Sequence, residues 1–215
     1  MKKKEVKEKK LVWYSLYRPA LNHILEFKKN KIIFGQFRNN TYALDTSSIM
    51  LSSNEYFIVS NSVNLKYLLS ILNSNIIKFY NTITMNSLQG NTTISQKNIF
   101  ENSPIKIINN ANQKPFEIMV DFILALKPNK ELEYISSFFE KVIDVAVYEL
   151  YFKDELHKEG FGVLNILENE LKNVEINLQN IEQTYKIWSQ KEHKIAYNVY
   201  YIHVLDVVKT IEGKK

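Results

Sequence analysis

The sequence predicts an α+β fold: an N-terminal twisted mixed β-sheet domain with helices, followed by a mainly α-helical domain. Two observations predict this class. Within residues 31–60, short runs rich in β-branched and aromatic residues alternate with polar turns. From residue 64 onward, apolar residues recur mainly at spacings of three and four, the period of a helix with one buried face. With 215 residues and 45% hydrophobic content, the chain can bury a substantial core.

Three segments predict strands. The first covers residues 31–37, where Gly35 indicates a bulge or a close backbone approach. The second and third, residues 41–45 and 55–60, each follow a turn rich in Ser or Asn. A helical turn over residues 21–25 is expected before the first strand.

The central stretch combines a helix, a polar loop and a strand. The helix, residues 65–80, is predicted by one apolar face made of Leu65, Leu68, Leu69, Leu72, Ile76, Phe79 and Tyr80. Residues 82–97 are short hydrogen-bonding side chains with one glycine and no acid, which suits contacts with base edges and phosphates. Alternatively, this loop is a solvated connection whose Ser, Thr and Asn side chains stabilise turns. After Ser103 and Pro104, Ile105, Ile107 and Ile108 predict a strand.

Helices are predicted for most of the remaining chain. Pro115 is expected at the first position of a helix that reaches residue 127, and the Lys-Pro-Asn that follows marks a domain boundary. A helix is predicted over 131–159, and a coiled-coil-like seam over 164–188. The seam either packs on the 132–150 stripe or forms an intermolecular coil. For the last third of the 192–213 segment, the sequence pattern does not distinguish a helix from a strand. The domains are therefore a disordered basic leader over 1–10, a domain over 11–127 and a helical domain over 128–215.

Charge is distributed unevenly along the chain. Residues 1–127 carry 17 Lys and Arg against 8 Asp and Glu, whereas residues 128–215 carry 11 against 15. Ten residues at the N-terminus contribute +4 of this excess. Four basic residues and no acid lie between Phe27 and Tyr42. The N-terminal part is therefore the one that would approach a polyanion.

The motifs of several enzyme classes are absent. The sequence has no GxxxxGK[ST] phosphate loop, no HExxH, no Asn-Pro-Pro-aromatic motif of amino-methyltransferases and no Gly-rich cofactor loop. Its four histidines are scattered, and structural or surface roles are expected for them. It has no cysteine, no signal peptide and no apolar run long enough to span a membrane, so we expect a cytoplasmic protein that is not an enzyme by itself.

Five segments follow one another in a distinctive order: Lys31-Ile-Ile-Phe, Tyr56-Phe-Ile-Val, Leu65-Lys-Tyr-Leu-Leu-Ser-Ile-Leu-Asn-Ser, Ser103-Pro-Ile-Lys-Ile and Gln113-Lys-Pro-Phe-Glu. Together they resemble the TaqI-like C-terminal specificity domain, the target-recognition part of adenine-specific DNA methyltransferases and of fused type II restriction enzymes. Residues 138–151 and the closing Ile211-Glu-Gly resemble the helical tail that follows this domain in the fused enzymes. Type I specificity subunits, which carry spacer helices after a similar recognition domain, are similar too.

The resemblance implies a module for recognising double-stranded DNA, as a fragment or a stand-alone subunit of a restriction-modification enzyme. Its partners would be methyltransferase and endonuclease domains, in cis or on a partner subunit. Those upstream domains would hold S-adenosylmethionine and magnesium, and no cofactor is expected in this chain. Phosphate contacts are expected from Lys28, Lys29, Lys31 and Lys97, and base contacts from Gln36, Arg38, Gln89, Asn91, Thr92 and Thr93.

A second hypothesis belongs to another class. The chain would be a helical interaction or scaffolding protein that uses the 164–188 seam as its binding surface. Salt separates the two hypotheses, because neutralising phosphates releases counterions and an apolar seam does not.

Overall fold

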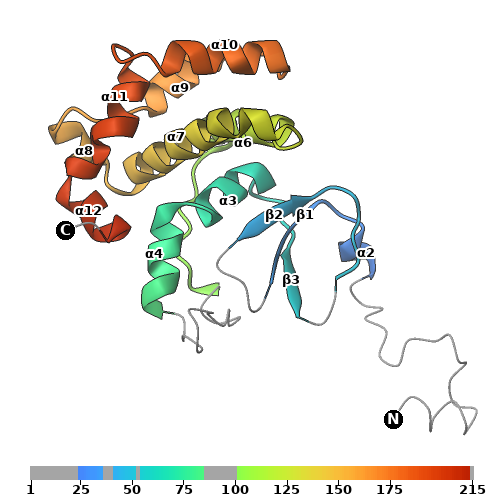
Figure 1. The fold of residues 1–215 in the computed structure, drawn as a ribbon. Helices are drawn as coiled ribbons and strands as arrows, with labels where there is room; N and C mark the ends of the chain where they lie inside the picture. The colour runs from blue at the N-terminus through green and yellow to red at the C-terminus, as the bar shows by residue number, and fades with distance from the viewer. Residues whose placement is uncertain (1–23, 36–40, 52–53, 85–100, 214–215) are drawn as a thin grey trace, which may run out of the picture.

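A small antiparallel sheet and a stack of helices make up the computed structural model, which describes residues 24–35, 41–51, 54–84 and 101–213 (Figure 1). This arrangement confirms the predicted α+β class. The predicted leader, residues 1–10, lies outside the described residues. The elements in chain order are α2 (Ile24–Phe27), β1 (Lys31–Gly35), β2 (Tyr42–Asp45), β3 (Glu55–Ile58), α3 (Leu65–Leu72), α4 (Asn75–Thr84), α6 (Asn110–Leu126), η2 (Lys130–Leu132), α7 (Glu133–Tyr151), α8 (Lys153–Lys158), α9 (Leu164–Glu170), α10 (Leu178–Trp188), α11 (Lys194–Tyr201), η3 (Ile202–Val204) and α12 (Asp206–Glu212).

The three predicted strands form one sheet in the order β2-β1-β3. Both pairings are antiparallel, so the described sheet is not the mixed sheet that was predicted. Ile32 of β1 stands opposite Leu44 and Ile58, and these three side chains join the hydrophobic core. Helix α3 packs against β1 and β2, which fixes the sheet to the helical part of the molecule.

The helix predicted over 65–80 is broken into α3 and α4. Asn73 ends α3, and its side chain makes two hydrogen bonds with the backbone of Tyr42 on the edge strand β2, at 3.1 and 3.0 Å. Asn75 then starts α4, and its backbone N–H donates to the carboxylate of Asp144 on α7 at 2.9 Å. Because both partners are remote in sequence, the apolar periodicity of residues 65–80 gave no sign of the break.

Helices α6 and α7 form the middle layer of the molecule. Helix α6 begins five residues before Pro115, because Asn109 caps it by accepting from the N–H of Asn112 at 2.8 Å. The prediction that Pro115 opens the helix was therefore wrong. The helix predicted over 131–159 is also divided, into α7 and α8, because the backbone of Phe152 leaves the helical region.

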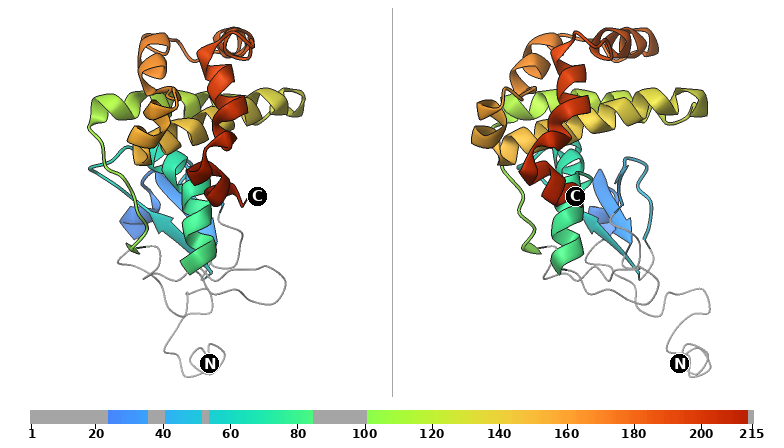
Figure 2. Two further views of the ribbon diagram at one scale, coloured as in Figure 1. Left: turned by 90° about the vertical axis from the view of Figure 1, so that its left-hand side faces the viewer. Right: turned by 60° about the vertical axis from the view of Figure 1, so that its left-hand side comes forward.

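The C-terminal segments are helical: α9 and α10 lie on the far side of α6 and α7 from the sheet, whereas α11 leads back past α7 to α12, which packs beside α4 (Figures 1 and 2). The predicted seam is not one helix: α9 ends before Leu171, and α10 starts after Asn177. Two asparagines explain the break, since Asn173 has a left-handed backbone and the Asn177 side chain caps α10. The last third of the 192–213 segment, for which helix and strand were left open, is the helix α12, which follows α11 and η3.

The hydrophobic core runs without interruption from β1 to α12. It crosses residues 127–128, where a domain boundary was predicted, because α6 packs closely on α7 and α9. The division into separate domains over 11–127 and 128–215 stays a prediction. None of the described helices is long and apolar enough to cross a membrane.

Candidate nucleic-acid interface

The turn between α2 and β1 presents the first predicted phosphate contacts. Lys28 and Lys29 are both exposed. Lys29 forms an ion pair with Glu26 at 2.9 Å, one turn back in α2. The side chain of Lys28 has no acidic partner among the described residues, and its backbone carbonyl accepts from the Ser48 hydroxyl at 3.2 Å. Both ammonium groups are therefore on the surface, where solvent-exposed pairing is weak enough to exchange for a phosphate.

Lys31 is in a different position, and its predicted role needs correction. Its side chain is fully buried, and its ammonium group forms an ion pair with Asp45, which stands opposite it on β2. It also donates to the carbonyl of Phe27 at 2.8 Å. The charge of Lys31 is therefore used inside the protein and cannot reach a phosphate without breaking this buried pair.

Asp45 is the acceptor at the centre of this arrangement. It accepts from the backbone N–H of Ser47 at 2.9 Å and of Ile49 at 3.0 Å, besides its pair with Lys31. The Lys31 ammonium, together with these backbone donors, holds the pKa of Asp45 well below its usual range. The pair ties α2, β1 and the turn after β2 together, on either side of the turn that carries Lys28 and Lys29.

The other predicted contacts lie outside the described residues: Gln36, Arg38, Gln89, Asn91, Thr92, Thr93 and Lys97. The described residues on either side show from which elements these segments leave. Residues 36–40 join β1 to its neighbour β2. Residues 85–100 follow the C-terminal end of α4.

Helix α4 adds candidate contacts that the sequence analysis did not single out. Ile76, Ile77 and Asn81 are buried, whereas Lys78 and Thr82, one turn apart, are exposed. Lys78 makes a long hydrogen bond of 3.4 Å to the side chain of Asn75 and has no acidic partner within 4 Å among the described residues. Lys66, by contrast, is paired with Asp121 at 2.6 Å. Counting lysines along the sequence could not separate these two cases, because the partner of Lys66 is 55 residues away.

Residues 104–109 form no strand, contrary to the prediction for 105–108. Side chains take the place of a neighbouring strand here. The Tyr67 hydroxyl donates to the Lys106 carbonyl at 2.5 Å, and the Tyr151 hydroxyl donates to the Pro104 carbonyl. Tyr151 also accepts from the N–H of Lys106 at 3.0 Å. Ile105 and Ile108 pack on the core, but Ile107 is 63% exposed, so the apolar alternation was misleading.

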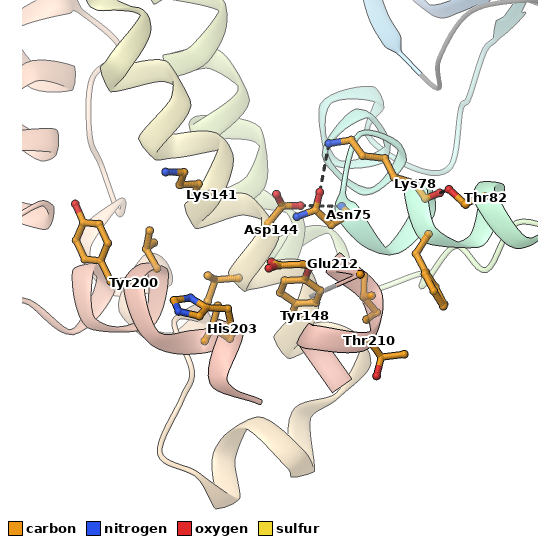
Figure 3. A pocket seen from close by; sticks show the side chains of 16 residues that line it. Asn75, Lys78, Thr82, Lys141, Asp144, Tyr148, Tyr200, His203, Thr210 and Glu212 are labelled. Atoms are coloured by element: carbon orange, nitrogen blue, oxygen red, sulfur yellow. Dashed lines mark hydrogen bonds between the residues drawn. The ribbon is translucent and has the colours of Figure 1, made fainter. Parts of the chain in front are cut away.

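A cavity of about 800 Å³ lies between α4, α7 and the C-terminal helices α11 and α12 (Figure 3). Asp144, Tyr148 and Glu212 lie together on its wall, and the Tyr148 hydroxyl contacts Glu212 at 3.3 Å. Burial raises the pKa of Asp144 to about 6, although its bond from the Asn75 N–H acts in the opposite direction. Lys78 and Lys141 line the same cavity.

The described residues form no candidate metal site. They contain no group of three or more His, Cys, Asp or Glu side chains placed to hold a metal ion. Two of the histidines have structural partners: His157 contacts Glu149 at 2.7 Å, and His193 accepts from the Ile195 N–H at the start of α11. The N-terminal part therefore presents cations and hydrogen-bonding groups on its surface. The polar cluster of Asp144, Tyr148 and Glu212 lies nearby, between α4, α7 and α12.

Comparison with known protein families gives a match for the N-terminal part of the chain. Residues 1–105 match the family model of the TaqI-like C-terminal specificity domain. Residues 106–215, which include α6 to α12, lie outside this match. No curated protein and no solved structure matches the chain.

Proposed function

From the match of residues 1–105 to the TaqI-like C-terminal specificity domain, we propose that the chain recognises a specific sequence in double-stranded DNA. It would do so as the specificity module of a restriction-modification enzyme that methylates adenine at N6 and cleaves DNA. The family match carries this proposal. The excess of basic residues in the N-terminal part and the exposed Lys28, Lys29 and Lys78 support it.

Two kinds of contact with DNA would be made, to phosphates and to bases. Lysines would hold phosphates, which fixes the position of the protein on the duplex without reading its sequence. We place Lys28 and Lys29 in this group, keep Lys97 there, and add Lys78 in place of the buried Lys31. Gln36, Arg38, Gln89, Asn91, Thr92 and Thr93 stay the proposed base contacts, since Gln and Asn can pair bidentately with adenine and Arg with guanine.

Binding to duplex DNA at several salt concentrations tests this function. The target is first selected from a random duplex pool, and its affinity is then compared with that of a scrambled duplex. We expect preference for the selected sequence and a log-affinity that falls linearly with log salt. Equal binding of both duplexes would contradict sequence recognition, and absence of duplex binding would contradict the function altogether.

The chain would act without chemistry of its own. Methyl transfer and cleavage would belong to partner domains in cis or on a second subunit, and S-adenosylmethionine and magnesium would bind there. We therefore expect the purified chain to transfer no tritium from labelled S-adenosylmethionine to DNA and to leave duplexes uncut with magnesium. Either activity would show that it carries a catalytic centre.

The alternative, a scaffold that binds partners through the 164–188 seam, receives less support. Leu167, Leu171, Ile181 and Trp188 of that seam are buried within the chain itself. A surface that is already covered by α6, α7 and α11 is not free for a partner helix.

A further inference from the structure

Helix α7 lies outside the matched domain, yet it holds two separate segments of the N-terminal part. We propose that α7 is a positioning element for DNA recognition: Asp144 fixes the first residue of α4, and Tyr151 fixes residues 104–106. The inference rests on the proposed function. It adds that sequence discrimination depends on side chains of the C-terminal helical part that touch no DNA.

The first contact is at the start of α4. The N–H of Asn75 is one of the unpaired donors that every helix leaves at its N-terminus, and Asp144 accepts from it at 2.9 Å. The nearest side chain in sequence, Ser74, donates its hydroxyl to the Ile71 carbonyl and accepts a long hydrogen bond of 3.5 Å from the N–H of Ile77, so it leaves the N–H of Asn75 to another partner. Asp144 is therefore the residue that caps this end from outside, and it sets where α4 begins relative to α7 (Figure 3).

The second contact is at Pro104 and Lys106. Here the backbone has neither helix nor strand partners. The Ile105 N–H donates to the Ser103 carbonyl at 2.8 Å, and the polar groups of Pro104 and Lys106 bond to side chains instead. The Tyr151 hydroxyl satisfies two of them at once, donating to the Pro104 carbonyl and accepting from the Lys106 N–H. The Lys106 ammonium in turn donates to the Leu150 carbonyl near the end of α7.

Both contacts come from one helix. Asp144 and Tyr151 are seven residues apart, so they lie on the same face of α7, two turns apart. Tyr148, between them, contacts Glu212 of α12, which joins the C-terminal helices to the same face. In the sequence, α4 precedes residues 85–100, and residues 104–106 follow them. Through its two contacts, α7 therefore fixes α4 and residues 104–106 relative to each other.

The experiment compares four variants of the full chain. Asp144→Ala removes the acceptor for Asn75, and Asp144→Asn keeps an oxygen in the same place. Tyr151→Phe removes only the hydroxyl. Tyr134→Phe makes the same change on α7 at a side chain that is 58% exposed, and it is the matched control.

The first readout needs no DNA. Amide hydrogen exchange followed by NMR should show the Asn75 N–H exchanging at least about tenfold faster in Asp144→Ala, and the Lys106 N–H likewise in Tyr151→Phe. Asp144→Asn and Tyr134→Phe should match the parent at both amides. Unchanged exchange in Asp144→Ala and Tyr151→Phe would overturn the inference and leave the proposed function standing.

The second readout is the ratio of affinities for the selected and the scrambled duplex. We expect this ratio to fall about tenfold in Asp144→Ala and Tyr151→Phe, roughly the contribution of one bidentate contact between a side chain and a base. The slope of log-affinity against log salt should not change. Asp144→Asn should restore the parent ratio. Faster exchange with an unchanged ratio would overturn the positioning role. A parent chain that binds no duplex would overturn the proposed function, and the positioning role in recognition with it.

Discussion

A single buried lysine shows what a charge count leaves out. Lys31 stands among four basic residues in a stretch without acids, and the sequence therefore suggested a phosphate contact. The antiparallel register places Asp45 directly opposite it, and both side chains are buried. The pairing partner follows from strand register, which the sequence pattern did not specify at this edge of the sheet.

This buried pair gives the first prediction. Asp45→Ala leaves the Lys31 ammonium buried without its counterion, so we expect the free energy of unfolding to fall by about 3–5 kcal/mol at pH 7. Glu26→Ala, which removes the exposed partner of Lys29, should cost less than about 1 kcal/mol. Urea unfolding of both variants and the parent measures this.

The pH dependence of that difference has a definite sign. Lys31 holds the pKa of Asp45 below its usual range, so the unfolded chain takes up a proton at Asp45 more readily than the folded one. The stability from Asp45 is therefore fully present above about pH 4 and decreases as pH falls below that value. The gap between the parent and Asp45→Ala should narrow from pH 5 to pH 3, and a constant gap would contradict the assignment.

The second prediction concerns Asp144, whose pKa is raised by the fold, whereas that of Asp45 is lowered. Its pKa is raised to about 6 by burial, so its contribution to stability is greatest below about pH 4 and is lost as pH rises through about 6. Asp144→Asn keeps the acceptor for Asn75 without the buried charge. It should be more stable than the parent at pH 8, by about 1–3 kcal/mol, and equally stable near pH 4. Thermal unfolding across this range checks the expectation, and a less stable variant at pH 8 would refute it.

At the scale of elements, local signals located the three strands of the sheet, whereas the apolar alternation at 105–108 and the Pro115 signal were misleading. The three strands were predicted to within about two residues at each end. The helix boundaries were not, because Asn73 and Asn75 are held by partners from distant parts of the chain. The break after Leu171 had a local sign in Asn173 and Asn177, but the regular spacing of apolar residues outweighed it. Seven of the ten predicted DNA contacts lie outside the described residues, so for those the sequence is still the only guide.

The seam gives the third prediction, at two of its own positions. Leu171 is fully buried, whereas Leu178 is 48% exposed. Leu171→Asp would bury an unpaired carboxylate and should cost about 3 kcal/mol or more. Leu178→Asp, the same change at an exposed seam residue, should cost well under half of that. If Leu171→Asp melts at the parent temperature, the seam is exposed in solution and an intermolecular coil becomes the better interpretation.

For the whole molecule, the uneven charge and the continuous core suggest different roles for the two parts: one would bind DNA, and the other would hold the first in shape. The basic excess is confined to residues 1–127, and the acidic excess to residues 128–215. The core nevertheless joins the two parts, with α3 and α4 packed on α6 and α7. A surface for DNA on one part can therefore be held in shape by the other, as the hydrogen bonds from α7 indicate.

The last prediction separates the two kinds of proposed DNA contact across this molecule. Replacing Lys28 and Lys29 with Ala should weaken binding to every duplex about equally and reduce the salt slope by up to about 0.9 for each phosphate that is no longer neutralised. Preference for the selected sequence should survive. Replacing the exposed Lys153 and Lys158 of α8 removes the same charge from the C-terminal part and should change the slope little.

Replacing Gln89, Asn91 and Thr93 with Ala should have the reverse effect. The slope should stay nearly constant, because no cation is removed, while the advantage of the selected duplex falls by about 1–3 kcal/mol for each bidentate pairing with a base that the substitutions abolish. Affinity measured at several salt concentrations for both duplexes gives slope and preference from one data set. If this triple variant keeps the preference of the parent, the 86–97 segment does not read the sequence, and the base contacts must come from Gln36, Arg38 or the exposed face of α4.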